Sequence, residues 1–155
     1  MIVTFHDRFQ RSGPQLFGNF SGEHLVETRI LIVDDSPLVR HRLRDLLQQH
    51  PDWQVCGEAA NGHDAISRAR ELTPDVIVLD FLMPGMNGMQ AAREIGKLIP
   101  DVPILMFTTH LSRQLVEEAR NVGIRGAVAK SDARYVIDGL EALLRNESFF
   151  YSSPN

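Results

Sequence analysis

An acidic residue stands at the end of an apolar run in the stretch PDVIVLDFLMPGMNG, residues 74–88. Four apolar residues lead directly into Asp80, and a turn rich in Pro, Gly and Asn follows at once. A run without polar alternation is typical of a strand buried on both faces, although a short buried helix has the same pattern. The carboxylate at its end is therefore either a capping group or a chemical one.

Four further polar residues follow other apolar runs. Asp34 and Asp35 come after RILIV, Thr108 after VPILMF and Lys130 after RGAVA. If these runs are parallel strands, their carboxyl ends meet at one edge of the sheet, where open α/β folds bind their ligands. We therefore expect these polar side chains to lie close to Asp80.

Three carboxylates at one edge suggest a metal site. Left alone they would repel one another, and the pKa of at least one of them would rise. A divalent cation removes that cost. Ligation by oxygen alone suits Mg²⁺, or Mn²⁺ in its place, and such an ion keeps open positions that phosphate oxygens can fill. We predict that Asp34, Asp35 and Asp80 bind this cation.

Phosphoryl transfer onto a carboxylate needs a nucleophile, a metal, a cationic side chain and a hydrogen-bond donor. Asp80 is the candidate nucleophile because it stands alone at the end of its strand, whereas Asp34 and Asp35 are paired for the metal. Lys130 would neutralise one phosphate oxygen, and the Thr108 hydroxyl would donate a hydrogen bond to another. The predicted product is an aspartyl phosphate at Asp80.

From residue 29 onwards, five predicted strands alternate with five predicted helices. The predicted strands are RILIVDD, WQVCGEAA, DVIVLD, VPILMFT and RGAVA. The first predicted helix begins with Ser36 as its N-cap and Pro37 at the first helical position. Alternation of this kind predicts an α/β fold with a parallel sheet, helices on both faces and right-handed crossovers.

Composition narrows the class of protein. The chain has 155 residues, about one domain, and its net charge of -4 gives no sign of a nucleic-acid-binding surface. The single cysteine, Cys56, has no partner within the chain, which fits a reduced compartment better than a secreted one. No apolar run approaches the roughly 18 residues of a membrane span. The sequence predicts a cytoplasmic protein that binds neither membrane nor nucleic acid directly.

In this order and spacing, the pair Asp34–Asp35, the stretch DFLMPGMNG from Asp80, Thr108 and Lys130 resemble the receiver domain of bacterial two-component response regulators. The likeness covers residues 29–147, and it is specific because the whole ordered set on successive strand ends is hard to reach by chance. It implies a flavodoxin-like, doubly wound sheet of five parallel strands in the order 2-1-3-4-5. It also implies phosphorylation by a histidine kinase or a histidine phosphotransfer protein, with Mg²⁺ present.

Carried over residue by residue, the resemblance makes Asp80 the phosphoacceptor, Asp35 a direct metal ligand and Asp34 a ligand largely through water. The backbone carbonyl of Leu82 would be a further metal ligand. Phosphorylation would shift the chain between two conformations and change what binds to a surface made of the fourth helix, the fifth strand and the fifth helix. A homodimer through the same surface is expected.

Three positions depart from the family pattern. Many receivers carry an aromatic residue three positions before the lysine, where this chain has Ala127, and a proline after the lysine, where it has Ser131. A small alanine is frequent after the threonine, where this chain has Thr109. None of these changes removes a chemical group, so phosphorylation is expected to survive. The aromatic half of the usual switch is missing.

Two other interpretations compete with a phosphorylated switch. Phosphatases of the haloacid dehalogenase type also form an aspartyl phosphate at a strand end, but with a second carboxylate two residues later, where this chain has Leu82. That difference argues against a turnover enzyme. The second interpretation is a receiver-like scaffold without phosphate control, which the intact acidic set opposes and Ala127 and Ser131 favour.

The two ends of the chain are predicted to lie outside the receiver domain. Residues 1–28 mix Gly, Ser, Pro and Asn with isolated aromatics, which predicts a flexible extension, and residues 148–155 are predicted to form a C-terminal tail. The last predicted helix resembles that of receivers in helix-turn-helix transcription regulators. The chain is therefore interpreted either as a stand-alone receiver with an unknown protein partner or as the receiver part of such a regulator.

Overall fold

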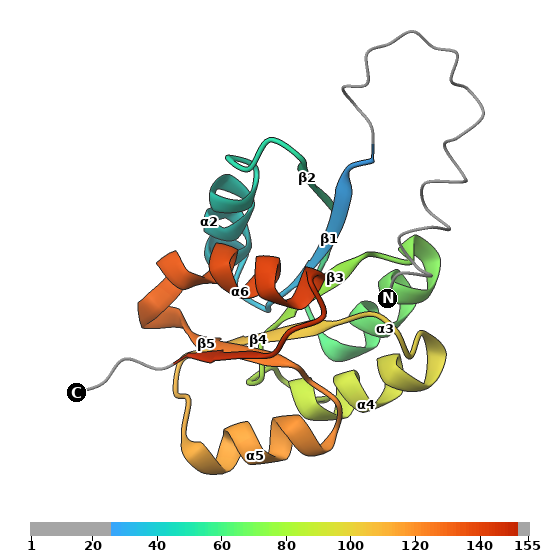
Figure 1. The fold of residues 1–155 in the computed structure, drawn as a ribbon. Coiled ribbons are helices and arrows are strands. Elements are labelled where there is room, and N and C mark those ends of the chain that lie inside the picture. Colours follow the sequence, from blue (N-terminus) through green and yellow to red (C-terminus); the bar gives the residue numbers. More distant parts are fainter. Residues whose placement is uncertain (1–25, 152–155) are drawn as a thin grey trace, which may run out of the picture.

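The computed structural model of the chain describes residues 26–151, which form one parallel sheet with helices on both faces (Figure 1). In chain order the elements are β1 (Thr28–Val33), α2 (Pro37–Leu47), β2 (Trp53–Ala59), α3 (Gly62–Leu72), β3 (Val76–Leu79), α4 (Gly88–Leu98), β4 (Ile104–Thr108), α5 (Arg113–Asn121), β5 (Gly126–Ala129), the 3₁₀ helix η2 (Lys130–Tyr135), α6 (Val136–Leu144) and β6 (Phe149–Tyr151). Most of the extension predicted for residues 1–28 lies outside the described residues. None of the described helices has the length and apolar character needed to cross a membrane.

The strand order is β2-β1-β3-β4-β5-β6, and every neighbouring pair is parallel. From β1 the chain moves to one side to form β2 and then returns past β1 to form β3 and the later strands. This reversal creates a topological switch point between β1 and β3, where the connections diverge at the carboxyl ends of the strands. The predicted doubly wound parallel sheet is confirmed.

The prediction of five strands is wrong by one, because residues Phe149–Tyr151 form β6 at the edge of the sheet. β6 is parallel to β5, so α6 is the crossover that joins the two strands. These residues belong to the segment 148–155 that was predicted to be a tail. Three consecutive aromatic residues carry no alternation, and a strand this short is specified by the edge on which it docks rather than by its own pattern.

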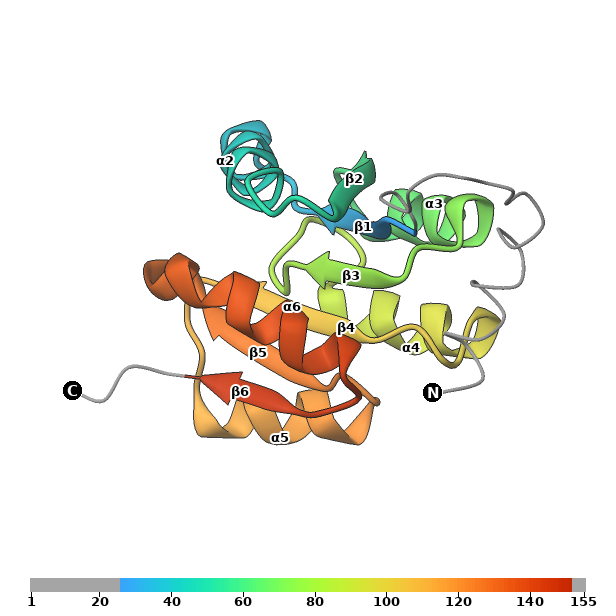
Figure 2. The same ribbon diagram turned by 45° about the horizontal axis from the view of Figure 1, so that its top comes forward.

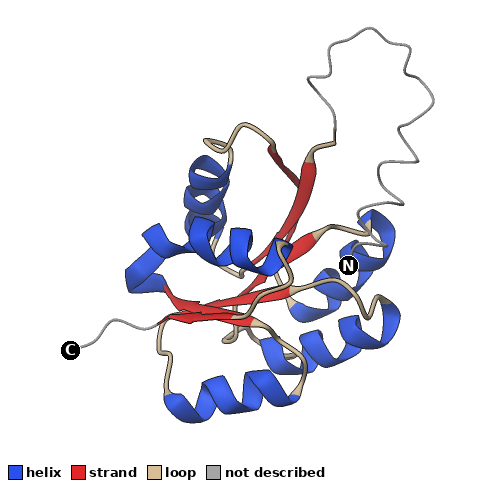
Figure 3. Cartoon of the chain, in the orientation of Figure 1, coloured by secondary structure: helices blue, strands red, loops and turns tan. Residues whose placement is uncertain are grey.

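Helices α2 and α6 cover one face of the sheet, and α3, α4 and α5 cover the other (Figure 3). The residues of β3 alternate between the two cores. Val76 and Val78 pack on the side of α2 and α6, whereas Ile77 and Leu79 pack on the side of the other three helices. All four are buried, which explains why the apolar run before Asp80 has no polar residue in it.

Polar caps fix where the helices begin after the strands. Ser36 is the N-cap of α2, and its side chain accepts a hydrogen bond of 3.2 Å from the backbone N–H of Val39, with Pro37 at the first helical position as predicted. At the start of α4, Asn87 and Gln90 form a reciprocal capping box. The cap at Ser36 limits the connection after β1 to residues 34–36, whereas the connection after β3 runs over residues 80–87 before the cap at Asn87.

Gly88, the first residue of α4, lies directly against the turn that follows β3. Its N–H donates a hydrogen bond of 2.8 Å to the Phe81 carbonyl. A Cβ atom at this position would overlap the Asp80 carbonyl oxygen and lie 2.8 Å from the Phe81 Cα atom. Because both neighbours are backbone atoms, any side chain at position 88 would push away the turn that carries Asp80.

We expect Gly88→Ala to lower the free energy of unfolding by about 1–3 kcal/mol, since it overpacks a backbone contact. Gly96→Ala, in the same helix, is the matched control. A Cβ at Gly96 meets open space, so alanine there should raise the free energy of unfolding by about 0.5–1 kcal/mol through the helix propensity of alanine. Urea denaturation of both variants measures the two effects. If both substitutions changed the free energy of unfolding equally, the contact of Gly88 with the backbone of Asp80 and Phe81 would not be what fixes this turn.

Candidate functional site

Asp34 and Asp80 lie side by side because the residues before them, Val33 and Leu79, are partners in the sheet. Asp34 is 1% exposed and Asp80 is 3% exposed, whereas Asp35 is exposed. One carboxylate oxygen from each of the three acids lies within 4.8 Å of the other two. The structure therefore brings together the three residues that were predicted to bind a cation.

Thr108 and Lys130 are also delivered by the register of the sheet. Thr108 pairs with Ala129, and these are the last residues of β4 and β5. Lys130 is the next residue after β5 and therefore lies at the same edge of the sheet as Thr108. The Lys130 Nζ atom lies 2.8 Å from Asp34 Oδ2 and 3.3 Å from Asp80 Oδ2. The lysine thus bridges the two buried carboxylates.

The hydroxyl of Thr108 is buried and has no hydrogen-bond partner among the described residues. Leaving a buried hydroxyl unpaired costs about 1–3 kcal/mol. The Thr108 hydroxyl, at the carboxyl end of β4, therefore has its hydrogen available for a ligand or a water molecule. The Thr108 side chain therefore fits the predicted role of a hydrogen-bond donor to phosphate.

Crowded charge dominates the electrostatics of the site. Burial raises the pKa of Asp80 to about 6, and the negative charge of Asp34 adds to that rise, while Lys130 opposes it. Burial alone would lower the pKa of Lys130, but its hydrogen bond to Asp34 and the charges of both acids raise it. The single ammonium group of Lys130 contacts two of the three carboxylates that lie together. The remaining negative charge, presented by oxygen atoms alone, fits a hard divalent cation.

Leu82 lies in the turn between β3 and α4, two residues after Asp80. Its side chain is 57% exposed, so the side chain makes little contribution to the core. Its backbone N–H lies close enough to Asp80 to lower the pKa of that carboxyl, although burial outweighs the effect. The role of the Leu82 carbonyl as a metal ligand stays a prediction.

Arg40 and Glu58, which were not singled out in the sequence, support the backbone at Asp34. Arg40 Nη1 donates a hydrogen bond of 2.7 Å to the Asp34 carbonyl. Glu58 accepts hydrogen bonds of 2.9 Å from Arg40 and 2.8 Å from Arg44. Burial would raise the pKa of Glu58, but the two arginines together lower it. A signal was available, because Glu58 is an acid inside the otherwise uncharged strand WQVCGEAA.

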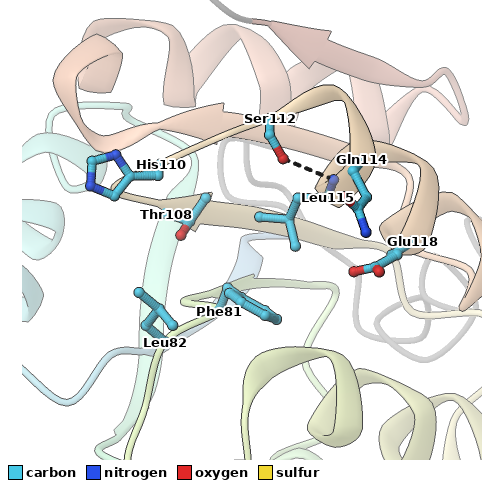
Figure 4. A pocket seen from close by; sticks show the side chains of 8 residues that line it. All are labelled: Phe81, Leu82, Thr108, His110, Ser112, Gln114, Leu115 and Glu118. Carbon is cyan, nitrogen blue, oxygen red and sulfur yellow. Dashed lines mark hydrogen bonds between the residues drawn. The ribbon is translucent and has the colours of Figure 1, made fainter.

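A pocket of about 310 Å³ opens beside the acids, between the turn after β3 and the start of α5 (Figure 4). Its lining residues are Phe81, Leu82, Thr108, His110, Ser112, Gln114, Leu115 and Glu118. Figure 4 shows Phe81 and Leu82 on the opposite side from Thr108 and His110. Thr108 therefore belongs both to this pocket and to the cluster of predicted site residues.

Ala127 occupies the position where many receivers have an aromatic residue. It is fully buried in β5, and its neighbours in register are Met106 of β4 and Phe150 of β6. Ser131 follows Lys130 in the short helix η2. Neither residue displaces the lysine from the two carboxylates.

Residues 30–141 match the response regulator receiver domain, which is the family that this fold and this arrangement of acids define. The chain belongs to the response regulator receiver family and is a receiver domain of two-component signal transduction.

Two response regulators of other bacteria are similar to the chain in sequence. The chain is 36% identical over 123 residues to the transcriptional regulatory protein YxjL of Bacillus subtilis and 35% identical over 123 residues to the response regulator protein VraR of Staphylococcus aureus. Each match covers 79% of this chain, and the matched part spans 56% of YxjL and 59% of VraR. The chain thus corresponds to little more than half the length of these two proteins.

Two solved structures share the fold. A two-component response regulator of the LuxR family from Aurantimonas sp. SI85-9A1 has a TM-score of 0.77 and 35% identity, with 79% of this chain and 89% of that chain covered. The response regulator domain of Thermotoga maritima CheB has a TM-score of 0.70 and 32% identity, with 77% of this chain and 95% of that chain covered.

Removing one of the crowded carboxylates should stabilise the chain when no divalent cation is present. The raised pKa of Asp80 means that ionisation of Asp80 opposes folding. The favourable contribution of the protonated form is present below the ordinary pKa of an aspartate and is lost as pH rises through about 6. We expect Asp80→Asn to raise the free energy of unfolding by on the order of 2–3 kcal/mol at pH 7.5 with EDTA.

Chemical denaturation at pH 7.5 and at pH 4 measures this effect, which should shrink at the lower pH. Added Mg²⁺ should also narrow the difference, because a cation that binds the folded protein stabilises the wild type preferentially. Asp101→Asn removes an exposed acid elsewhere and should give no such gain. If both variants respond alike, repulsion within the site is not the cause.

Proposed function

We propose that this receiver is a phospho-accepting switch in which Asp80 receives a phosphoryl group from a histidine kinase or a histidine phosphotransfer protein. The observation that supports the proposal best is the bridge from Lys130 to Asp34 and Asp80, beside the unpaired hydroxyl of Thr108. Together these groups supply a buried nucleophile, a positively charged lysine and a hydroxyl donor that has no partner within residues 26–151. Membership of the receiver family supports the same conclusion.

In the proposed reaction, a carboxylate oxygen of Asp80 attacks the phosphorus atom of a phosphohistidine. The bond from phosphorus to the histidine nitrogen breaks, and that nitrogen keeps the electron pair. Lys130, which already contacts Asp80, would turn to a phosphoryl oxygen, and Thr108 would donate its hydroxyl hydrogen to another. Bound Mg²⁺ would be held by Asp34, Asp35, Asp80 and the Leu82 carbonyl, and it would neutralise charge on the transferring group.

A switch is favoured over a turnover enzyme by the residue two positions after Asp80. A phosphatase using the same intermediate needs an acid or base near the leaving group, and this position holds the apolar side chain of Leu82. The scaffold interpretation is opposed by the geometry, since Lys130 keeps contact with both acids despite Ala127 and Ser131. The aspartyl phosphate is therefore proposed as a signal, not as a step in turnover.

The output of the switch is proposed to lie on the surface formed by α5, β5 and α6, the fourth helix, fifth strand and fifth helix of the predicted pattern. Because YxjL is a transcriptional regulatory protein and a structural neighbour is of the LuxR family, we favour a receiver that controls a DNA-binding output. A stand-alone receiver with a protein partner is the alternative. In both cases we place the protein in the cytoplasm.

Incubation with acetyl phosphate and Mg²⁺ should add one phosphoryl group to the intact chain, as measured by mass spectrometry. The adduct should be absent with EDTA and absent in Asp80→Asn, while Asp101→Asn should keep it. Thr108→Ala should reduce the yield, because the hydroxyl that stabilises the transferred group is gone. An unmodified mass in the presence of Mg²⁺ would favour the scaffold, and rapid repeated hydrolysis of a substrate would favour an enzyme.

Phosphorylation should also promote a homodimer through α5, β5 and α6. We expect the elution volume on a sizing column to fall when acetyl phosphate and Mg²⁺ are present. Asp80→Asn under the same conditions should elute as the untreated chain does. A shift that persists in Asp80→Asn would mean that association does not depend on the phosphoryl group.

A further inference from the structure

Each polar group of Asp34 lies against a partner. The backbone N–H donates a hydrogen bond of 3.1 Å to the Ala59 carbonyl, and Oδ1 accepts one of 2.9 Å from the Ser36 N–H. Oδ2 lies 2.8 Å from Lys130 Nζ, and the backbone carbonyl accepts a hydrogen bond of 2.7 Å from Arg40 Nη1. The position of this acid is therefore fixed through its backbone as well as through its side chain.

The contact from Arg40 holds the peptide unit that joins Asp34 to Asp35, because the carbonyl that Arg40 binds belongs to that unit. Asp35 is exposed, so the backbone between the two acids, rather than packing, sets where its carboxylate lies. A rotation of this peptide unit would change the distance between two of the three acids that lie together. Arg40 thus controls the geometry of the acidic cluster without being part of it.

Glu58 of β2 fixes the direction of the Arg40 guanidinium. Arg40 Nε donates a hydrogen bond of 2.9 Å to Glu58 Oε1, and the two side chains are only 18% and 28% exposed. Because a guanidinium is planar and rigid, holding Nε also sets the direction in which the other N–H groups point. Figure 2 shows α2, which carries Arg40, beside β2 at the edge of the sheet.

An irregularity in β2 turns Glu58 towards α2. The pairing of β2 with β1 skips Cys56, since Val55 and Gly57 pair with consecutive residues of β1. Strict alternation from Val55 would place Glu58 on the face of α3. With Cys56 left out of the count, Glu58 lies opposite Ile32, on the face that α2 and α6 cover. Bulges beside functional sites commonly redirect a side chain in this way.

The charge of Arg40 by itself works against a cation at the acids, because a guanidinium next to Asp34 repels a divalent ion. Glu58 offsets that charge by pairing with Arg40 at 2.9 Å and with Arg44 at 2.7 Å. A favourable contribution of Arg40 to cation binding must therefore come from orientation and not from charge.

We propose that Arg40 is a positioning residue for the cation site and that Glu58 acts through it. The inference rests on the proposed binding of Mg²⁺ by Asp34, Asp35 and Asp80. Arg40 contacts neither the cation nor the phosphoryl group in this proposal, and it acts only by fixing the Asp34 peptide unit. Groups that orient metal ligands in this indirect way typically change metal affinity by about 10–100-fold.

The test measures Mg²⁺ binding to the full-length chain by isothermal titration calorimetry without any phosphodonor. Arg40→Met keeps the apolar stem of the side chain and removes the guanidinium. We expect Mg²⁺ binding to weaken by about tenfold, because the Asp34 peptide unit is no longer held. A role through charge alone predicts the opposite sign, since a positive charge near the acids has been removed.

Arg44→Met is the matched control, because Arg44 pairs with the same acid, Glu58, whereas Arg40 is the residue that binds the Asp34 carbonyl. It should bind Mg²⁺ as tightly as the wild type does. Arg40→Lys keeps the charge but lacks the planar fork that reaches both partners, so it should also weaken binding and covers the case in which Arg40→Met fails to fold. Urea denaturation of each variant shows whether it is folded under the conditions of the titration.

Glu58→Gln tests the second part of the proposal. It should weaken Mg²⁺ binding in the wild-type background, because Arg40 loses the partner that orients it. In the Arg40→Met background the same change should have little further effect, since Glu58 acts through Arg40. Additive effects of the two substitutions would show that Glu58 acts by another route.

Unchanged affinity in both Arg40 variants, or tighter binding in Arg40→Met, would overturn the positioning role. Equal weakening in Arg44→Met would also overturn it, since the contact with Asp34 would not be the cause. A wild type that binds no Mg²⁺ would overturn the cation site and this inference together. Binding of Mg²⁺ without phosphorylation of Asp80 would overturn the proposed switch and leave the role of Arg40 standing.

Discussion

The ion pairs of Lys130 are the interaction on which the site depends. Asp34 and Asp80 are buried next to each other at the ends of β1 and β3, and isolated carboxylates in that position would be protonated or would destabilise the fold. The ammonium group contacts both, at 2.8 Å and 3.3 Å, and it comes from the end of β5, two strands away from β3. Three strands must therefore keep their register for the charges to meet. The sheet and the site are therefore a single unit. A shift of one residue in the register of any of these strands would leave a buried charge without its partner.

Much of this arrangement is written in the local sequence. Uninterrupted apolar runs indicate buried parallel strands, Ser36 and Pro37 indicate a helix start, and parallel strands necessarily bring their carboxyl ends to one edge. The support of Asp34 by Arg40 and Glu58 is different, because it joins a helix to a strand that is distant in sequence. No local pattern identifies which arginine will meet which acid. The pKa of Asp80 likewise depends on burial and on the charge of Asp34. The residues next to Asp80 in the sequence specify neither of these.

The sixth strand was missed for a related reason. A run of three aromatic residues near the end of a chain has no period, and its conformation is set by what receives it. Gly126 and Gly139 supply the space, and a left-handed Asn146 turns the chain towards it. Each of these residues has an ordinary local explanation, a glycine in a strand, a glycine in a helix and an asparagine after a helix. Only the folded structure shows that all three residues help to place Phe149.

The geometry links the two ends of the proposed switch through the sheet. Met106, Ala127 and Phe150 form one row across β4, β5 and β6, and Thr108 lies two residues beyond Met106 on the same strand. If the hydroxyl of Thr108 moved towards a phosphoryl group on Asp80, the end of β4 would move with it and would disturb the row that ends at Phe150. Ala127 is the middle residue of this row. Its side chain is small, so β5 supplies no aromatic ring between Met106 and Phe150. A change at the buried carboxylates would then reach β6 at the edge of the sheet through the backbone register, which requires no mobile aromatic residue on β5.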